Sequence, residues 1–162
     1  MPKSHALGTV AFAACGLVAL PVQATPPSGF VGSVQWQGVF DPLNAKVKTD
    51  GIDLRIHSKE RMNLVVTRIA IAPSGTSGWH THPGMSLVTV LSGEITLYDP
   101  ALCTPRRLVA GQTFVDEGGD HVHLVRNETG APAEVGAVQL VQPGVPGRVD
   151  APRPNNCPAN VQ

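Results

Sequence analysis

Four of the six histidines in this 162-residue chain form two close pairs, His80 with His82 and His121 with His123. Glycines precede each pair, and a run of β-forming residues follows it. Because successive side chains on a strand point to opposite faces, residues two positions apart share one face. Imidazoles from two strands can therefore converge on one point, as the ligands of a divalent transition metal do. The two pairs predict a metal site inside a β structure.

Longer motifs surround the two pairs. The segment 75–93 reads Gly, a short gap, His-x-His and a later Gly, and the segment 111–127 reads Gly, a glycine pair, a histidine and a closing Asn. Together these segments resemble the two conserved blocks of the cupin superfamily. The resemblance implies a jelly-roll barrel of two antiparallel sheets, with a metal held at one end of its lumen.

The resemblance also implies the ligands. The histidine pair of the first block falls on His80 and His82. The histidine of the second block falls on His123, because Asn127 then follows four positions later, as in the family. His121 remains a competitor, because counting forward from the glycine pair reaches it.

Two departures from the family pattern change the expected site. The Glu ligand of the first block should fall at position 86 or 87, where this chain has Ser86 and Leu87. The Pro of the second block is replaced by Asp116 or Glu117. Because a serine hydroxyl is a poor ligand for a divalent ion, the site expected from the resemblance is a neutral one of three histidines.

Three neutral imidazoles with an open coordination position suit Fe, Zn, Ni or Cu. Mn prefers oxygen ligands and is less favoured. His121 is expected to be either a fourth ligand or a proton shuttle. Glu117 and Asp120 could each accept a hydrogen bond from an imidazole N–H or cap a turn.

Short β-forming runs between turn residues predict an all-β fold, specifically a single jelly-roll barrel. The chain has 17 Gly and 15 Pro, which argues against long helices. The alternation of side chains within 63–71 indicates a half-buried antiparallel strand, and Ser92 with Gly93 is expected to form a hairpin turn. The expected strands are 33–40, 52–56, 63–71, 86–91, 94–98, 106–109, 112–115, 122–126 and 134–141.

Three segments are expected along the chain. Residues 1–24 have the weakly positive start, the apolar stretch and the small residues before a cleavage site that are typical of a signal peptide. An N-terminal anchor helix and a lipoprotein modified at Cys15 are the alternatives. Residues 25–150 are expected to form the barrel domain, and residues 151–162 an irregular Pro-rich tail. Cleavage of a signal peptide would make the protein secreted or periplasmic.

Two cysteines, Cys103 and Cys157, would remain after the leader is removed. In an exported chain a pair of cysteines is expected to form a disulfide. This disulfide would tie the C-terminal tail to a loop of the barrel. Neither cysteine lies near the histidines in the sequence, so we expect a structural cross-link rather than a metal ligand.

The charge balance bears on the partners. The 12 Lys and Arg residues equal the 12 Asp and Glu residues, and no run of basic residues is present, which argues against nucleic acid or an anionic membrane as a partner. We expect a small-molecule ligand or substrate instead, and the resemblance implies a homodimer. The lumen walls are expected to be aliphatic, formed by Val66, Val88, Val90, Leu97 and Val125 or their neighbours.

These expectations combine into a functional hypothesis. The chain is expected to be an exported cupin that binds a divalent transition metal and acts on a small molecule, with dioxygenase-type oxidoreductase chemistry as the first choice. A non-catalytic module for metal-dependent binding or sensing of a small ligand is the alternative. A barrel without a metal is a third reading.

Overall fold

The computed structural model describes residues 24–99 and 104–155. Within these residues every regular element is a β-strand, so the described part of the chain contains no helix that could span a membrane. The expected leader, apart from Ala24, and both cysteines of the expected disulfide, Cys103 and Cys157, lie outside the described residues. The signal peptide, the disulfide and export therefore stay predictions.

The strands of the described residues follow one another with short connections. They are β1 (Ser28–Phe40), β2 (Asn44–Lys48), β3 (Asp53–His57), β4 (Met62–Thr76), β5 (His80–Thr81), β6 (Met85–Ser92), β7 (Glu94–Tyr98), β8 (Pro105–Val109), β9 (Thr113–Asp116), β10 (Leu124–Arg126), β11 (Ala133–Val141) and β12 (Val149–Asp150).

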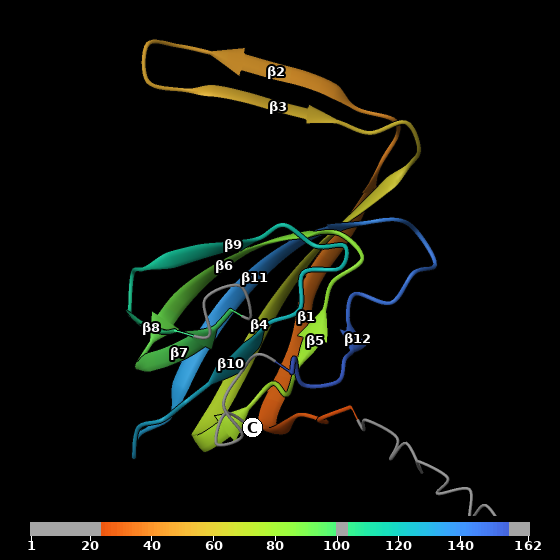
Figure 1. Ribbon diagram of the computed structural model, residues 1–162. Coiled ribbons are helices and arrows are strands. Elements are labelled where there is room, and N and C mark those ends of the chain that lie inside the picture. The colour runs from red at the N-terminus through yellow and green to blue at the C-terminus, as the bar shows by residue number, and fades with distance from the viewer. Residues whose placement is uncertain (1–23, 100–103, 156–162) are drawn as a thin grey trace, which may run out of the picture.

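Most strands belong to one strongly curved antiparallel sheet that forms a nearly closed barrel (Figure 1). Its strands follow the order β8-β7-β10-β4-β11-β6-β9, and β1 pairs along β4 as well. The long strand β4 links the two faces of the barrel, because residues 63–71 pair with both β1 and β11 whereas Thr76 pairs with Arg126 of β10. The all-β jelly-roll class predicted from the sequence is confirmed.

Side-chain alternation in β4 separates the lumen from the outer surface. Thr67 and Ile69 line the lumen, and Ile71 is buried in the core. Arg68 lies between the first two, is exposed and forms an ion pair with Glu134 of β11. The alternation predicted for 63–71 is therefore present.

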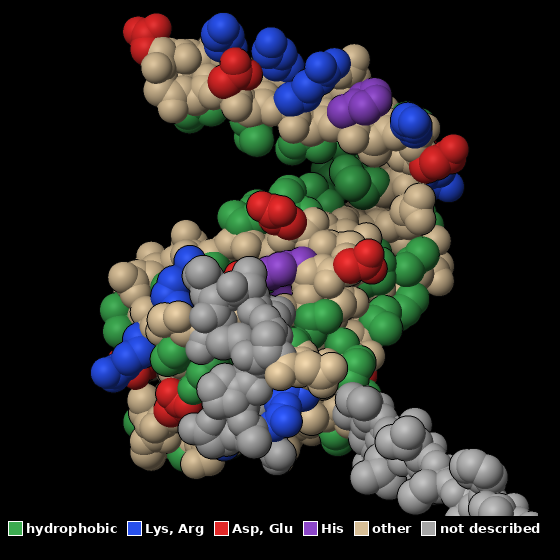
Figure 2. Space-filling view, viewed as in Figure 1, with side chains coloured by type: hydrophobic (Ala, Val, Ile, Leu, Met, Phe, Trp, Pro, Cys, Tyr) green, Lys and Arg blue, Asp and Glu red, His purple; other side chains and the backbone are tan. Residues whose placement is uncertain are grey.

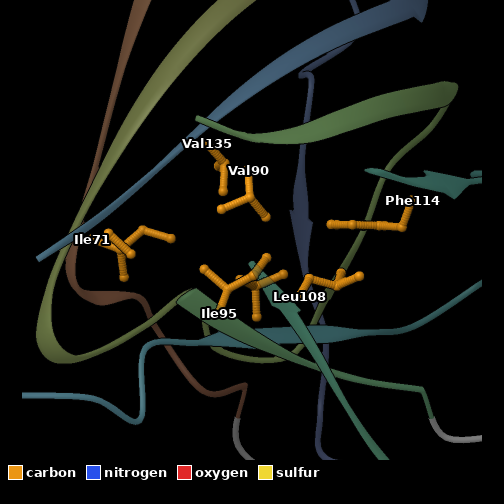
Figure 3. Close-up of a cluster of buried hydrophobic side chains, with 8 residues drawn as sticks. Ile71, Val90, Ile95, Leu108, Phe114 and Val135 are labelled. Atoms are coloured by element: carbon orange, nitrogen blue, oxygen red, sulfur yellow. The ribbon is translucent and has the colours of Figure 1, made fainter. Parts of the chain in front are cut away.

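The main core lies between the two faces of the barrel, and its apolar side chains point toward one another (Figure 3). Each fully buried Val, Leu, Ile or Phe side chain stabilises the fold by about 1.5–3 kcal/mol relative to an exposed one. A second, smaller cluster consists of Trp79, Tyr98 and Leu124. The buried members of the main core are Ile71, Val90, Ile95, Leu108, Phe114, Val125, Ala133 and Val135.

The predicted hairpin at Ser92 and Gly93 is wrong. β6 ends at Ser92 and β7 begins at Glu94, but β6 pairs with β11 and β9, whereas β7 pairs with β10 and β8. The chain therefore crosses from one face of the barrel to the other at this point. Gly93 has φ +71°, and a Cβ there would lie 2.7 Å from the carbonyl oxygen of Pro132, so only glycine fits this crossing.

Strands β2 and β3 form a two-stranded hairpin that projects from the barrel, and we call residues 44–57 the arm (Figure 1). β2 was not expected from the sequence. Val47 pairs with Leu54, and Lys46 pairs with Arg55, so cross-strand partners give the arm one apolar and one basic face. Figure 2 shows the Lys and Arg side chains on the outer side of the arm and hydrophobic side chains on the side toward the barrel.

Candidate metal centre

Strand β5 lies between two other segments at one end of the barrel. On one side, the backbone N–H groups of His80 and His123 each donate to the other residue's carbonyl oxygen, at 3.0 and 2.9 Å. On the other side, His80 pairs with Asp150, and Thr81 pairs with Val149 of β12. Directly opposite residues of an antiparallel pair place their side chains on the same face. The ring centroids of His80 and His123 are accordingly 4.3 Å apart.

A close approach of two loops positions His82. The backbone N–H of Gly119 donates to the carbonyl oxygen of His82 at 2.8 Å. Gly118 has φ +78°, and a Cβ there would lie 2.6 Å from a carbonyl oxygen of the opposing loop. The ring centroid of His82 lies 4.8 Å from that of His80 and 5.3 Å from that of His123. The glycines beside the histidine pairs therefore allow the two segments to meet.

The structure brings together the three histidines that the resemblance implied as ligands. One ring nitrogen from each of His80, His82 and His123 lies within 4.8 Å of the other two. His80 and His123 are buried, and His82 is half-buried. Three imidazole nitrogens gathered in this way could hold a metal ion.

Backbone carbonyls contact Nδ1 of two of these rings. Nδ1 of His80 lies 2.9 Å from the carbonyl oxygen of Gly78, and Nδ1 of His82 lies 2.6 Å from that of Gly147. A carbonyl oxygen can only accept, so Nδ1 of His80 carries a hydrogen and its Nε2 keeps its lone pair. Nδ1 of His82 also lies 2.8 Å from the side-chain amide Nε2 of Gln139, which donates, so the two contacts of His82 call for opposite tautomers. Metal-binding histidines almost always donate their other ring N–H to a partner of this kind.

Burial keeps all three rings neutral. It lowers the pKa of His80 to about 2, with a further contribution from the neighbouring His123. Burial is also the main reason why the pKa of His123 falls to about 4 and why the pKa of His82 is lowered. At neutral pH each imidazole therefore has the uncharged form that a metal requires.

His121 contacts two carboxylates. Its Nδ1 lies 2.8 Å from Oδ1 of Asp116, its Nε2 lies 3.3 Å from Oδ2 of Asp99, and its side chain is 35% exposed. Burial lowers the pKa of His121, but the hydrogen bonds to Asp116 and Asp99 outweigh this effect, so its pKa is raised.

The rings of His121 and His123 stack with centroids 5.8 Å apart, but the strand predicted to carry them is wrong. β10 begins only at Leu124, so the segment that carries the two histidines is not a regular strand. Its irregular backbone lets His121 approach Asp116, and these two residues form a second group of potential ligands together with His123. His121 therefore belongs to a different group of potential metal ligands from His80 and His82.

Asp116 is the residue of this site that the sequence did not reveal. It ends β9, is 1% exposed and pairs with Ser86 across to β6. Its Oδ1 accepts hydrogen bonds from Nδ1 of His121 and, at 3.3 Å, from the backbone N–H of Gly118. Its Oδ2 has no hydrogen-bond partner and lies 4.0 Å from Nε2 of His82. A buried carboxylate therefore lies beside the three histidines expected from the sequence.

The other acidic residues considered from the sequence lie elsewhere. Glu117 and Asp120 are both exposed to solvent, whereas Asp116 beside them is buried. The replacement of the family's Pro by an acidic residue was a signal for this carboxylate. However, the sequence pattern does not contain the β6–β9 register, which turns Asp116 toward the histidines.

A cavity of about 340 Å³ opens beside the three histidines. Polar groups are concentrated at the histidine end, where Ser86, Gln139 and Arg148 also line it. Most of the remaining wall is apolar. The larger apolar residues of that wall are Phe30, Ile69, Val88, Phe114, Val125 and Val135.

The predicted lumen wall is correct in part. Val88 and Val125 line the cavity as expected, and Thr67 does so in place of its neighbour Val66. Val90 and Leu97 were expected in the wall as well, but Val90 belongs to the main core and Leu97 packs against it. The aromatic rings of Phe30 and Phe114 were not expected, because isolated aromatics carry no sequence signal for a cavity.

Asn127, which closes the second motif, has a structural role. Its side-chain Nδ2 donates to the carbonyl oxygens of Ile71, Ala72 and Ala131 at 3.2, 3.1 and 2.8 Å. Its Oδ1 accepts from the backbone N–H of Thr129 at 3.0 Å. Asn127 thus links the turn before β11 to strand β4 by hydrogen bonds and stabilises this end of the barrel.

Comparison with known proteins agrees with this geometry. The family model described as "Cupin domain" matches residues 67–141, a range that includes both histidine pairs and Asp116. A search of the curated proteins found no match.

Several solved structures are similar to this chain. The polyketide cyclase RemF from Streptomyces resistomycificus is 17% identical, with 57% of this chain and 63% of that chain covered and a TM-score of 0.48. An oxalate oxidase in complex with the substrate analogue glycolate is 26% identical, with 53% and 45% covered and a TM-score of 0.45. The Cupin_2 domain of an XRE family transcriptional regulator from Enterobacter cloacae is 18% identical, with 72% and 99% covered and a TM-score of 0.46.

The chain spans less than two thirds of the length of the first two of these structures. The family match covers strands β5 to β11 in full and residues 67–76 of β4, a range that contains most of the barrel and all four paired histidines. Together with the strand order and the two histidine motifs, this match shows that residues 67–141 of the chain are a cupin domain.

Proposed function

We propose that this protein is a metal-dependent cupin that holds a divalent transition metal with His80, His82 and His123 and acts on a small molecule in the adjacent cavity. The observation that carries the proposal is the meeting of three neutral imidazoles at the polar end of a mostly apolar cavity. The activity we propose is oxidoreductase chemistry of the dioxygenase type. Metal-dependent binding of a small ligand without turnover is the alternative.

The donor atoms fit a divalent ion. Two nitrogens that are each about 2.1 Å from a shared ion lie at most about 4.2 Å apart. The three histidine nitrogens are within 4.8 Å of one another, so a small inward rotation of the rings would suffice. Imidazole ligands suit Fe, Zn, Ni and Cu. A bound ion of this group would polarise an oxygen atom of the substrate or, if redox-active, exchange electrons with it.

The cavity limits what can bind. Its volume of about 340 Å³ is at the lower end of the range of about 300–1,000 Å³ that is usual for small-molecule sites. The side chains of Phe30, Phe114 and Val135 would cover the apolar part of a ligand and exclude water. Ser86 and Gln139 would orient a polar group toward the histidines. We therefore propose a small substrate with one polar end.

A chain of titratable groups favours an enzyme over a simple binder. The carboxylate of Asp116 is buried beside the histidines, His121 contacts it, and Asp99 contacts the other nitrogen of His121. The side chain of Asp99 is 33% exposed. These residues could move a proton between the buried site and solvent, which a binding module does not need.

Metal content tests the proposed site. We expect natively purified protein to contain close to one equivalent of a transition metal by elemental analysis. His82→Ala should reduce this content strongly, because it removes one of three nitrogens. His57→Ala is the matched control, since His57 lies in β3 of the arm, and it should leave the metal content unchanged. Equal metal content in all three proteins would refute the histidine site.

Oxygen uptake separates the two candidate activities. For a dioxygenase, small oxygen-containing substrates added to the metal-loaded protein should cause oxygen consumption that His82→Ala abolishes and His57→Ala does not. Saturable binding of such molecules with no oxygen uptake and no product would favour the binding module instead.

A further inference from the structure

We infer that Asp116 is a fourth metal ligand, and that its carboxylate replaces the glutamate expected at position 86 or 87. The inference rests on the proposed metal site and changes its chemistry from three nitrogens to three nitrogens and one oxygen. It concerns a residue on a different strand from the one on which the glutamate was expected.

Strand pairing explains how one carboxylate can replace the other. Ser86 of β6 and Asp116 of β9 are directly opposite partners in the antiparallel register. The Cβ atoms of such partners are about 4.5–5.5 Å apart and lie on the same face of the sheet. Both residues are 1% exposed, and Ser86 lines the cavity beside the histidines. The carboxylate of Asp116 on β9 therefore lies at the same end of the barrel as a carboxylate at position 86 of β6 would.

The two oxygens of Asp116 have different surroundings. Oδ1 accepts hydrogen bonds from His121 and Gly118. Oδ2 is buried without a hydrogen-bond partner and is 4.0 Å from Nε2 of His82. This separation is within the limit of about 4.2 Å for two atoms that bind one ion. The carboxylate of Asp116 is otherwise grouped with His121 and His123, so a shared ion requires Oδ2 to turn toward His80 and His82.

An unpaired carboxylate oxygen in a buried site is unfavourable, because the charge has lost its hydration. The three neighbouring imidazoles are neutral, so they supply no positive charge to compensate it. A divalent cation among these atoms would bind both the nitrogens and Oδ2. With one carboxylate the occupied site would carry a net charge of about +1 instead of +2, and its oxygen ligand makes Fe and Mn better matches than a three-nitrogen site does.

The competing role for Asp116 is to orient histidines from outside the coordination shell. Its contact with His121 is well formed, and its Oδ1 also lies 3.6 Å from Nδ1 of His123. In that role Asp116 would act through His121 or directly on His123. Removal of His121 reproduces the loss of Asp116 in the first case only, so His121 is the control for that case. A carboxylate moved to the opposite strand is the control for the second case.

The experiment compares Asp116→Asn with His121→Asn in the full chain. The measurements are Zn²⁺ affinity by competition with a chromophoric chelator, the visible spectrum of the Co²⁺-loaded protein, and thermal unfolding of the metal-free protein. Loss of an outer-shell partner typically lowers metal affinity about 10–100-fold. We expect Asp116→Asn to lower Zn²⁺ affinity by more than about 100-fold, to alter the Co²⁺ spectrum and to leave the metal-free protein at least as stable as wild type.

For His121→Asn we expect a smaller loss, of at most about 10–100-fold, because His121 is then the outer-shell partner of a ligand, and a Co²⁺ spectrum close to that of wild type. Equal losses in the two variants, or wild-type affinity in Asp116→Asn, would overturn the inference while leaving the three-histidine site in place. If the wild-type protein bound neither Zn²⁺ nor Co²⁺, the proposed function and the inference would both be wrong.

A carboxylate moved across the strand pair provides a second test. Ser86→Glu combined with Asp116→Asn should recover most of the lost Zn²⁺ affinity, because it restores a carboxylate at the opposite position. An outer-shell role for Asp116 predicts no recovery. Should the double variant fail to fold by circular dichroism, the Co²⁺ spectrum of Asp116→Asn still decides the question, because only loss of a direct ligand changes the set of donor atoms.

Discussion

The barrel and the arm are built from the same kind of alternating strand but distribute their side chains in opposite ways. In the barrel, apolar residues such as Ile71 and Val135 are 1% and 2% exposed, and a charged residue, Asp116, is buried. In the arm, Val47 and Leu54 are 46% and 52% exposed. The difference arises because a second layer of strands covers the inner face of the barrel, whereas β2 and β3 pair only with each other. Alternation in the sequence thus predicts a strand but not the layer that covers it.

This comparison predicts that acid destabilises the barrel much more than the arm. His80 and His123 have pKa values of about 2 and about 4 in the folded chain, against an ordinary value of 6.5. The unfolded chain therefore binds more protons below pH 6.5, so the free energy of unfolding falls as the pH falls from 6.5 toward 4. Each group contributes on the order of 1 kcal/mol per pH unit. The total loss at pH 4 should be several kcal/mol.

Tryptophan fluorescence checks this acid effect. Trp79 is fully buried, whereas Trp36 of β1 is 64% exposed, so the Trp36→Phe variant leaves the buried Trp79 as the single tryptophan reporter. Chemical denaturation of the metal-free variant at a series of pH values should give a falling free energy of unfolding below pH 6.5. A stability that is independent of pH between 6.5 and 4 would show that these histidines are not buried in the neutral form.

Two leucines compare the packing of the two regions directly. Leu124 is completely buried between Trp79 and Tyr98, whereas Leu54 lies on the exposed face of the arm. We expect Leu124→Ala to lower the free energy of unfolding by about 2–5 kcal/mol. The matched change Leu54→Ala should alter it by no more than about 0.5 kcal/mol. Urea denaturation of both variants tests this, and similar losses would mean that the arm is covered.

Some features of the fold and of the site could be predicted because their signals lie within one segment of the sequence, and others could not because they depend on contacts between segments. Spacing within one segment is local, so the proximity of His80 to His82 and the ranges of most barrel strands could be predicted. Contacts between segments depend on register, which no local pattern contains. For this reason the position of Asp116 opposite Ser86 was missed, and Ser92 with Gly93 was taken for a hairpin although the turn joins two strands that do not pair.

The free energy of local unfolding should be lower in the arm than in the barrel. β11 has partners on both sides, β4 and β6, and contributes Val135 to the core. An isolated two-stranded hairpin is marginally stable in water. Hydrogen exchange followed by mass spectrometry should therefore show fast exchange across 44–57 and strong protection across 133–141. Equally strong protection in the arm would indicate that another surface covers it, as the expected homodimer could.

The smallest expected difference concerns the ion pairs on the two regions. In the barrel, Nη2 of Arg107 contacts both carboxylate oxygens of Glu94, at 2.6 and 2.8 Å, whereas Lys48 in the arm is 3.9 Å from Asp53. Because a forked guanidinium contact is geometrically well defined, a double-mutant cycle on the barrel pair should give a coupling energy of about 0.2–1 kcal/mol at low salt. The arm pair is long and exposed, so its cycle should give no measurable coupling. Both cycles should approach zero in concentrated salt, because ions screen exposed charges. A larger coupling in the arm than in the barrel would show that the arm holds its side chains in a fixed geometry, contrary to its open two-stranded structure.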